Sequence, residues 1–142
     1  MTTLYNSDYY AWTQEQAKLL KERKWEEIDV NNLIEEVEAL GRQERKDLRN
    51  RLGILLGYLL KWQYQPKYHS NIWQATIREQ RRKIIGLLTE SPSLKPYFEE
   101  ILQASYEDGI DLAVRETNLP YSTFPIACPY TLEQTLDAEF LP

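Results

Sequence analysis

The chain contains few of the residues from which common active sites and metal sites are built. Its 142 residues include one cysteine, Cys128, and one histidine, His69. A single cysteine excludes an intramolecular disulfide, and these two residues cannot supply the three or four soft ligands of a zinc site. A nucleophile pair of Cys128 and His69 is formally possible. However, Cys128 lies among prolines without an acidic neighbour, which favours a packing role for its thiol.

Longer signatures are missing as well. Neither GxxxxGK[ST] nor GxGxxG occurs, so nucleotide-phosphate loops of these two kinds are excluded. No stretch approaches the roughly 18 continuous apolar residues of a membrane span. The first residues show no basic segment followed by an apolar one, as a secretory signal would. We therefore expect a cytoplasmic protein that does not enter a membrane. With five glycines and no Gly/Ser-rich linker, we expect one domain over residues 1–142.

Apolar residues at helical spacing dominate the chain. Stripes with a three- and four-residue step predict helices that begin after a cap at Asp8 or Ser7, at Asp29, at Ser70, and at Ser91 or Ser93. Thr131 and Gln134 form a capping box that predicts a short last helix. The pattern predicts an all-α fold: an antiparallel four-helix bundle with a long second helix and a short extra C-terminal helix. We expect the proline-rich segment 119–142 to pack across this bundle.

The second helix permits two interpretations. Residues 41–47 contain no apolar residue, so Gly41 can end one helix before another begins. Alternatively, residues 29–65 form one helix of about 55 Å at 1.5 Å per residue. A rotation of about 100° per residue returns Leu48 to the face begun by Leu33 and Val37. This agreement in phase favours the single helix, whose polar middle would be open to a partner chain.

Charge is divided into three blocks. Residues 42–83 carry eleven Lys and Arg against three Asp and Glu, whereas the segments before and after them are acidic. The basic block either pairs with the acidic helices beside it or forms a surface for nucleic acid. Aromatic residues within the block would allow bases to stack, although Trp62 and Trp73 also fit a core. The basic and aromatic surface would comprise Lys61, Tyr64, Lys67, Tyr68, Arg78 and Arg82.

Clustered carboxylates are the only enzymatic lead. Side chains three or four positions apart share a helix face, so acidic steps can converge on Mg²⁺, as in all-helical nucleotide pyrophosphohydrolases. A solvated acidic face is the alternative. The steps include Glu44 with Asp47, and the candidate metal ligands are Glu35, Glu38, Asp108 and Asp111.

Some charged residues fall on or beside apolar stripes, where a charge must be paired. We expect a buried charge network between helices, in which Arg81 or Arg51 meets Asp108 or Glu36. The full set of candidates is Glu36, Glu44, Arg51, Arg81 and Asp108.

Five phrases, taken in order, carry a family resemblance. They are residues 32–41 (NLIEEVEALG), residues 59–66 (LLKWQYQP), Trp73 with Thr76-Ile77 and Gln80-Arg81, residues 90–95 (ESPSLK), and Phe124-Pro125 with residues 128–130 (CPY). From about Tyr9 to Pro142 the chain resembles a bacterial family, abundant in cyanobacteria, called domain of unknown function 29. The resemblance implies an all-helical domain and supplies no catalytic residues. A histidine often precedes the Leu-Leu-Lys phrase in that family, and Tyr58 stands there in this chain, so histidine chemistry at that place is not expected.

The sequence therefore favours a non-catalytic intracellular helical interaction module, which self-associates or binds another protein and needs no cofactor. Two alternatives remain open at this point. One is a nucleic-acid-binding module that uses residues 42–83, and the other is a Mg-dependent enzyme that resembles nucleotide pyrophosphohydrolases.

Overall fold

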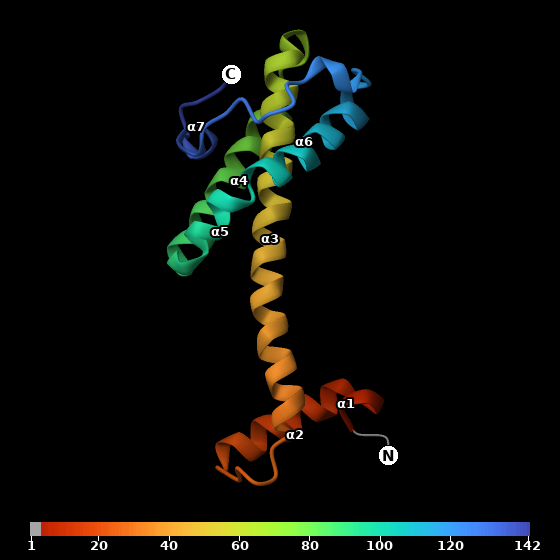
Figure 1. The fold of residues 1–142 in the computed structure, drawn as a ribbon, viewed down its shortest axis with the longest axis vertical. Coiled ribbons are helices and arrows are strands. Elements are labelled where there is room, and N and C mark those ends of the chain that lie inside the picture. The colour runs from red at the N-terminus through yellow and green to blue at the C-terminus, as the bar shows by residue number, and fades with distance from the viewer. Residues whose placement is uncertain (1–3) are drawn as a thin grey trace. The chain divides into compact units, whose positions relative to one another are not determined.

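A computed structural model describes residues 4–142, and every regular element in that range is helical (Figure 1). The all-α prediction is thus confirmed. The α-helices are α1 (Leu4–Ser7), α2 (Tyr9–Lys21), α3 (Val30–Tyr64), α4 (Asn71–Glu90), α5 (Lys95–Glu100), α6 (Leu102–Thr117) and α7 (Leu132–Leu136). Short 3-10 turns occupy Pro66–Tyr68, Pro92–Leu94 and Tyr121–Thr123. None of the helices described here is both long enough and apolar enough to cross a bilayer.

The chain divides into two compact units, and the boundary falls within α3. The first unit ends at Gln43, and the second comprises Glu44–Pro142. The α3 helix continues through Gly41, so the interpretation as a single helix is correct. Both neighbours of the boundary are polar, in line with the polar middle seen in the sequence. The prediction of one domain stays a prediction.

Several predicted helix starts are confirmed by their side-chain caps. The Asp8 carboxylate accepts from the Ala11 amide at 3.1 Å, and the Ser70 hydroxyl accepts from the Trp73 amide at 3.3 Å. Thr131 and Gln134 form the expected reciprocal capping box. These caps satisfy amide groups that have no partner inside the helix, which is why local sequence was enough to find them.

The predicted fourth helix is wrong in detail, because the chain forms two helices, α5 and α6, separated at Ile101. This residue has φ −88° and ψ 0°, outside the helical region. The bend coincides with two apolar side chains, Phe98 and Ile101, that are both buried in the core. The predicted cap at Ser91 or Ser93 is wrong as well, because no side-chain capping hydrogen bond precedes the Pro92–Leu94 turn or α5.

In the first unit, the aromatic residues of α1 and α2 pack beside the start of α3. The Tyr5 ring meets the Trp12 ring edge-on, with centroids 4.7 Å apart. The Trp12 indole donates to the Asp29 carboxylate at 3.0 Å, and Asn32 donates to the same carboxylate at 2.7 Å. These donors lower the pKa of Asp29, while partial burial acts in the opposite direction.

In the second unit, the C-terminal half of α3 is the central element of the core and packs against α4 and α6. Its leucines at helical spacing are fully buried, and Tyr106 of α6 is equally inaccessible. The core consists of Leu48, Leu52, Leu55, Leu56, Leu59, Leu60, Ile77, Ile84, Phe98, Ile101, Tyr106, Ala113, Phe124 and Tyr130. Phe124 and Tyr130 come from the proline-rich C-terminal segment, so this segment completes the core.

Glycines allow α3 and α6 to approach closely. An added Cβ at Gly109 would lie 2.8 Å from the backbone nitrogen of Gly57 and 3.1 Å from the carbonyl oxygen of Gly53. Real Cβ atoms essentially never approach another heavy atom within 3.0 Å, so the first of these contacts could not form without a shift of the helices. Gly109 therefore interrupts the apolar stripe of α6 because the backbones of two helices meet there, as the sequence indicated.

Candidate functional site

Two acidic residues of α3 form ion pairs with a basic residue on the same helix. Arg42 contacts Glu35 at 3.1 Å and Glu38 at 3.9 Å, and all three side chains are exposed. Glu35 and Glu38, the candidate metal ligands in the first unit, therefore lie close together, but both contact the Arg42 guanidinium. Exposed pairs of this kind add little stability, about 0–1 kcal/mol each.

The acidic residues of α6 have partners of a different kind. Asp108 accepts from the Arg49 guanidinium at 3.0 Å, and Asp111 accepts from the Tyr121 hydroxyl at 3.0 Å. Within residues 4–142, no three His, Cys, Asp or Glu side chains gather in a group suited to a metal ion. The carboxylates on which the enzymatic alternative rests are thus distributed among separate polar contacts.

The five residues expected to form one buried charge network lie in separate places. Arg51 donates to Asp47 and to Gln80, both at 3.4 Å. Glu44 is exposed. Asp108, as described above, pairs with Arg49 at the surface. The expectation is corrected for a physical reason: helix phase indicates which face a residue occupies, but not whether another element covers that face.

Glu36 forms its own contacts in the first unit. The hydroxyls of Tyr5 and Tyr9 each donate to its carboxylate at 2.6 Å. The two hydrogen bonds lower the pKa of Glu36. The same contact raises the pKa of Tyr5 to about 12, because ionising the phenol would remove a donor and place two anions together. Glu36 thus fastens α1 and α2 to α3.

Arg81 is buried, as the sequence predicted, but its partners are backbone carbonyls. Its guanidinium donates to the carbonyl oxygens of Thr135 at 2.9 Å, Gln134 at 3.2 Å and Phe140 at 2.7 Å. Thr135 and Gln134 lie in the last turn of α7, where carbonyls lack partners within the helix. Burial lowers the pKa of Arg81, and the nearby Asp137 charge opposes this effect. Arg81 therefore fixes the C-terminal segment to α4.

Lys61, which was predicted to belong to the basic and aromatic surface, is buried. Only 4% of the residue is exposed. Its ammonium contacts the Glu116 carboxylate at 2.7 Å and lies 4.1 Å from the Tyr58 ring centroid and 4.6 Å from the Trp73 ring centroid. Aromatic faces attract a cation, so the two rings and one carboxylate make a complete environment for the charge.

Sequence reasoning missed Glu116, which comes from the end of α6, 55 residues after Lys61. The Tyr58 hydroxyl also reaches Glu116, at 3.4 Å. Burial and the Glu116 charge raise the pKa of Tyr58. Tyr58, which directly precedes the Leu-Leu-Lys phrase, is therefore part of the Lys61–Glu116 contact.

The other residues of the predicted basic and aromatic surface differ in exposure. Tyr64 is half-buried, and its ring meets Phe124 edge-on at 5.2 Å. The exposed members are Lys67, Tyr68, Arg78 and Arg82. Trp62 stacks on His69 with centroids 3.6 Å apart. Of the two tryptophans expected as core residues in the alternative, Trp62 is partly buried and packs against the core. Trp73 is half-buried, with the Lys61 ammonium over its ring.

Cys128 and His69 are engaged with different groups. The Cys128 thiol contacts the Tyr130 carbonyl oxygen at 3.5 Å, and burial raises the pKa of that thiol. His69 Nε2 lies 2.6 Å from the Trp62 carbonyl oxygen. A raised pKa reduces the thiolate fraction, which is the reactive form. These contacts fit a packing role for Cys128.

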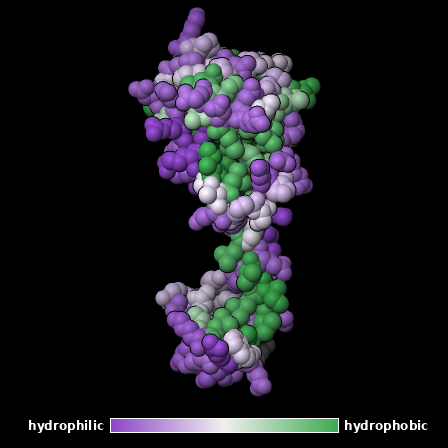
Figure 2. Space-filling view, turned by 90° about the vertical axis from the view of Figure 1, so that its left-hand side faces the viewer, coloured by the Kyte–Doolittle hydropathy of each residue, from purple (hydrophilic) through white to green (hydrophobic). Residues whose placement is uncertain are grey.

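Two features stand out as surfaces for binding. The first is an apolar face on α3 within the first unit. Its side chains are Val30 (49% exposed), Ile34 (51%), Val37 (66%) and Leu40 (69%), which we call the α3 stripe. Figure 2 shows apolar residues reaching the surface of this N-terminal part of the chain. Isolated exposed apolar residues are common, whereas these four share one face of a single helix.

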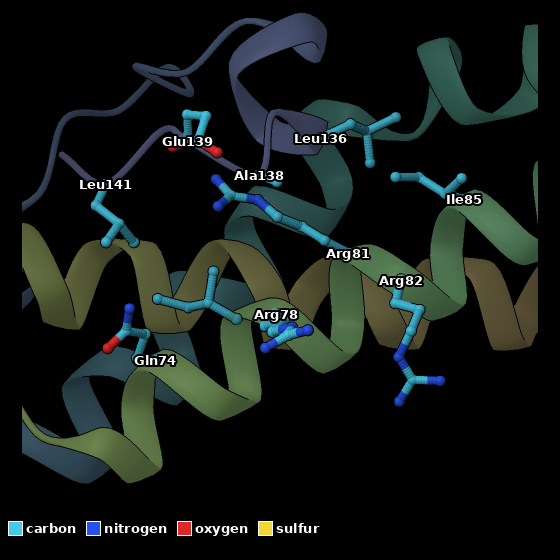
Figure 3. A pocket seen from close by; sticks show the side chains of 10 residues that line it. Gln74, Arg78, Arg81, Arg82, Ile85, Leu136, Ala138, Glu139 and Leu141 are labelled. Atoms are coloured by element: carbon cyan, nitrogen blue, oxygen red, sulfur yellow. The ribbon is translucent and has the colours of Figure 1, made fainter.

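The second feature is a cavity of about 550 Å³ in the second unit, between α4 and the C-terminal segment (Figure 3). We call it the α4 cleft. Its lining combines apolar residues with Arg78, Arg81 and Arg82. Small-molecule sites generally have volumes of about 300–1,000 Å³, so the cleft is large enough to hold a ligand.

Comparison with known proteins identifies a family. The profile of "Domain of unknown function DUF29" matches residues 4–141, and the chain therefore belongs to this family. Neither the curated proteins nor the solved structures include a significant match.

Proposed function

We propose that this DUF29 protein is a non-catalytic interaction module that self-associates through the α3 stripe. The observation that carries the proposal is the exposure of four large aliphatic side chains on one face of a helix. Apolar surface in water is unfavourable, and burying it against a partner removes that cost. Spacings of three and four residues along the stripe are those by which helices interlock side by side.

The charges along α3 support a second copy of the chain as the partner. Acidic residues, among them Glu26 and Glu27, precede the stripe, and a basic run starts after it at Arg42. Two stripes overlaid in antiparallel orientation would place the acidic segment of each copy near the basic run of the other. The surface is thus complementary to itself, as a two-fold symmetric dimer requires.

The energetic weight of one residue can be worked out for Val37. Burying a whole valine side chain stabilises by about 1.5–3 kcal/mol, and two-thirds of Val37 is available for burial, which gives about 1–2 kcal/mol per copy. A symmetric dimer contains the residue twice, so its loss weakens association by about 2–4 kcal/mol. At 1.4 kcal/mol per tenfold, this corresponds to at least roughly 30-fold.

The experiment compares Val37→Glu with Asn31→Glu by sedimentation equilibrium over a concentration series. Asn31 is exposed and lies off the stripe, so the control introduces the same charge and side chain into the same helix. We expect the wild type and Asn31→Glu to exceed the 16.9 kDa of one chain and Val37→Glu to remain at it. Circular dichroism verifies that all three are equally helical. A monomeric wild type, or a Val37→Glu protein that associates like the wild type, contradicts the proposal.

A further inference from the structure

The α4 cleft is independent of the α3 stripe, because all of its lining residues belong to the second unit. One wall is α4, and the other is the C-terminal segment that follows Thr135 (Figure 3). Arg81 holds the walls together through its three backbone carbonyl partners. The cleft is therefore built by a buried contact and not by the chance approach of two loops.

The walls of the cleft are apolar. Among the lining residues, Ile77 is 1% exposed, whereas Ile85 of α4 and Leu141 of the C-terminal segment remain 45% and 37% exposed. In Figure 3, Leu136 and Leu141 lie on the C-terminal side and Ile85 on α4. In Figure 3, Leu141 and Ile85 lie toward opposite ends of the cleft. Both leave apolar surface open to water, which an alkyl chain lying along the cleft would cover.

The cleft is also positively charged. Arg78 and Arg82 are exposed, four residues apart on one helix face, and neither forms an ion pair with any described residue. The only carboxylate in the lining is Glu139, against three arginines. This positive lining lies in a chain whose net charge is −5, so it is a local reversal of the overall sign.

We propose that the α4 cleft binds a small amphipathic anion, a medium-chain alkyl carboxylate. The carboxylate lies between the guanidinium groups of Arg78 and Arg82, whose planar forks match its two oxygens. The alkyl chain occupies the space between Ile85 and Leu141. Apolar walls alone would accept any alkyl chain, and the two unpaired arginines give preference for an anionic head.

The test is calorimetric titration of the full chain at physiological salt with three probes: decanoate, acetate and decyltrimethylammonium, each below its micelle-forming concentration. Decanoate is expected to bind at least about tenfold more tightly than either of the others, a difference of about 1.4 kcal/mol. Acetate has the head without the chain, and the ammonium compound has the chain with the opposite charge. If decanoate does not bind, or if the cationic probe binds equally well, the proposal is wrong.

A matched pair of double variants locates the site. Arg78→Gln with Arg82→Gln removes two positive charges from the cleft and is expected to weaken decanoate binding at least about tenfold. Lys67→Gln with Arg115→Gln removes two exposed charges outside the cleft and is expected to leave affinity unchanged. Equal loss in both variants means that binding is only a response to net charge, which overturns the assigned site. Val37→Glu is expected to bind decanoate normally, so failure of one proposal does not affect the other.

Discussion

Replacing Gly109 with alanine tests the close approach of α3 and α6 on which the second unit is built. The added Cβ would lie 2.8 Å from the Gly57 nitrogen, 3.1 Å from the Gly53 oxygen and 3.2 Å from the Leu56 Cβ. Two of these atoms belong to the backbone of α3 and cannot rotate away. The helices must separate, which disturbs the packing of Leu56 and its neighbours.

The size of the effect follows from two opposing contributions. In a helix interior, alanine is more favourable than glycine by about 1 kcal/mol. Forcing an extra methyl group into a packed interface costs typically about 1–3 kcal/mol. Gly86 in α4 supplies the reference, because an added Cβ there meets nothing within 4 Å. Gly86→Ala is expected to stabilise by up to about 1 kcal/mol.

The difference between Gly109→Ala and Gly86→Ala isolates the packing cost, since both exchanges gain the same helix propensity. In urea unfolding of the full chain, followed by circular dichroism, the free energy of unfolding of Gly109→Ala should be about 1–3 kcal/mol lower than that of Gly86→Ala. Gly57→Ala provides a second variant at the same contact, with 3.0 Å from the new Cβ to the Gly109 oxygen. If Gly109→Ala proves as stable as Gly86→Ala, the two backbones do not meet as described.

Three other changes have defined outcomes. Arg81→Ala leaves three carbonyl oxygens without their donor, which costs about 1–3 kcal/mol of stability for each oxygen that stays buried. The urea midpoint should therefore fall, and amide exchange should accelerate in the C-terminal segment. Glu116→Gln leaves the buried Lys61 ammonium without a counter-charge and should destabilise by up to about 3–5 kcal/mol, whereas adding Lys61→Met should recover part of this loss. Because the folded pKa of Glu36 is lowered, its contribution is present above the ordinary pKa near 4.5 and is lost as the pH falls through the lowered value. The protection factors of α2 amides, which are exchange rates corrected for their intrinsic pH dependence, should therefore fall in acid, and fall less in Glu36→Gln; an equal response in the variant would contradict the assignment.

Features set by neighbours in sequence were predictable. The caps at Asp8, Ser70 and Thr131 satisfy amides three residues away, so the residue types alone indicate the helix starts. The leucines of α3 recur at helical spacing and are buried in the second unit. The bend at Ile101 was not predictable, because nothing in the local pattern distinguishes one continuous helix from two with a shared apolar face.

Partners of charged residues were harder to predict, and Arg81 shows why. Its position on the edge of an apolar stripe correctly indicated burial, and a carboxylate was the expected partner. The structure supplies carbonyl oxygens from α7 instead. A helix C-terminus presents acceptors whatever its side chains are, so no residue type marks it. Lys61 and Glu116 illustrate the same difficulty, since their contact depends on how α3 and α6 pack.

The α3 helix shows what periodicity can and cannot establish. The same three- and four-residue spacing runs through Val37, which is 66% exposed, and through Leu48 and Leu52, which are fully buried. Spacing determines that these residues share a face, whereas covering that face requires other elements of the fold. In the second unit, α4, α6 and the C-terminal segment supply the cover. For the α3 stripe, we propose that a second copy of the chain supplies the cover in antiparallel orientation. One sequence pattern thus builds a core at one end of a helix and, by our proposal, an interface at the other.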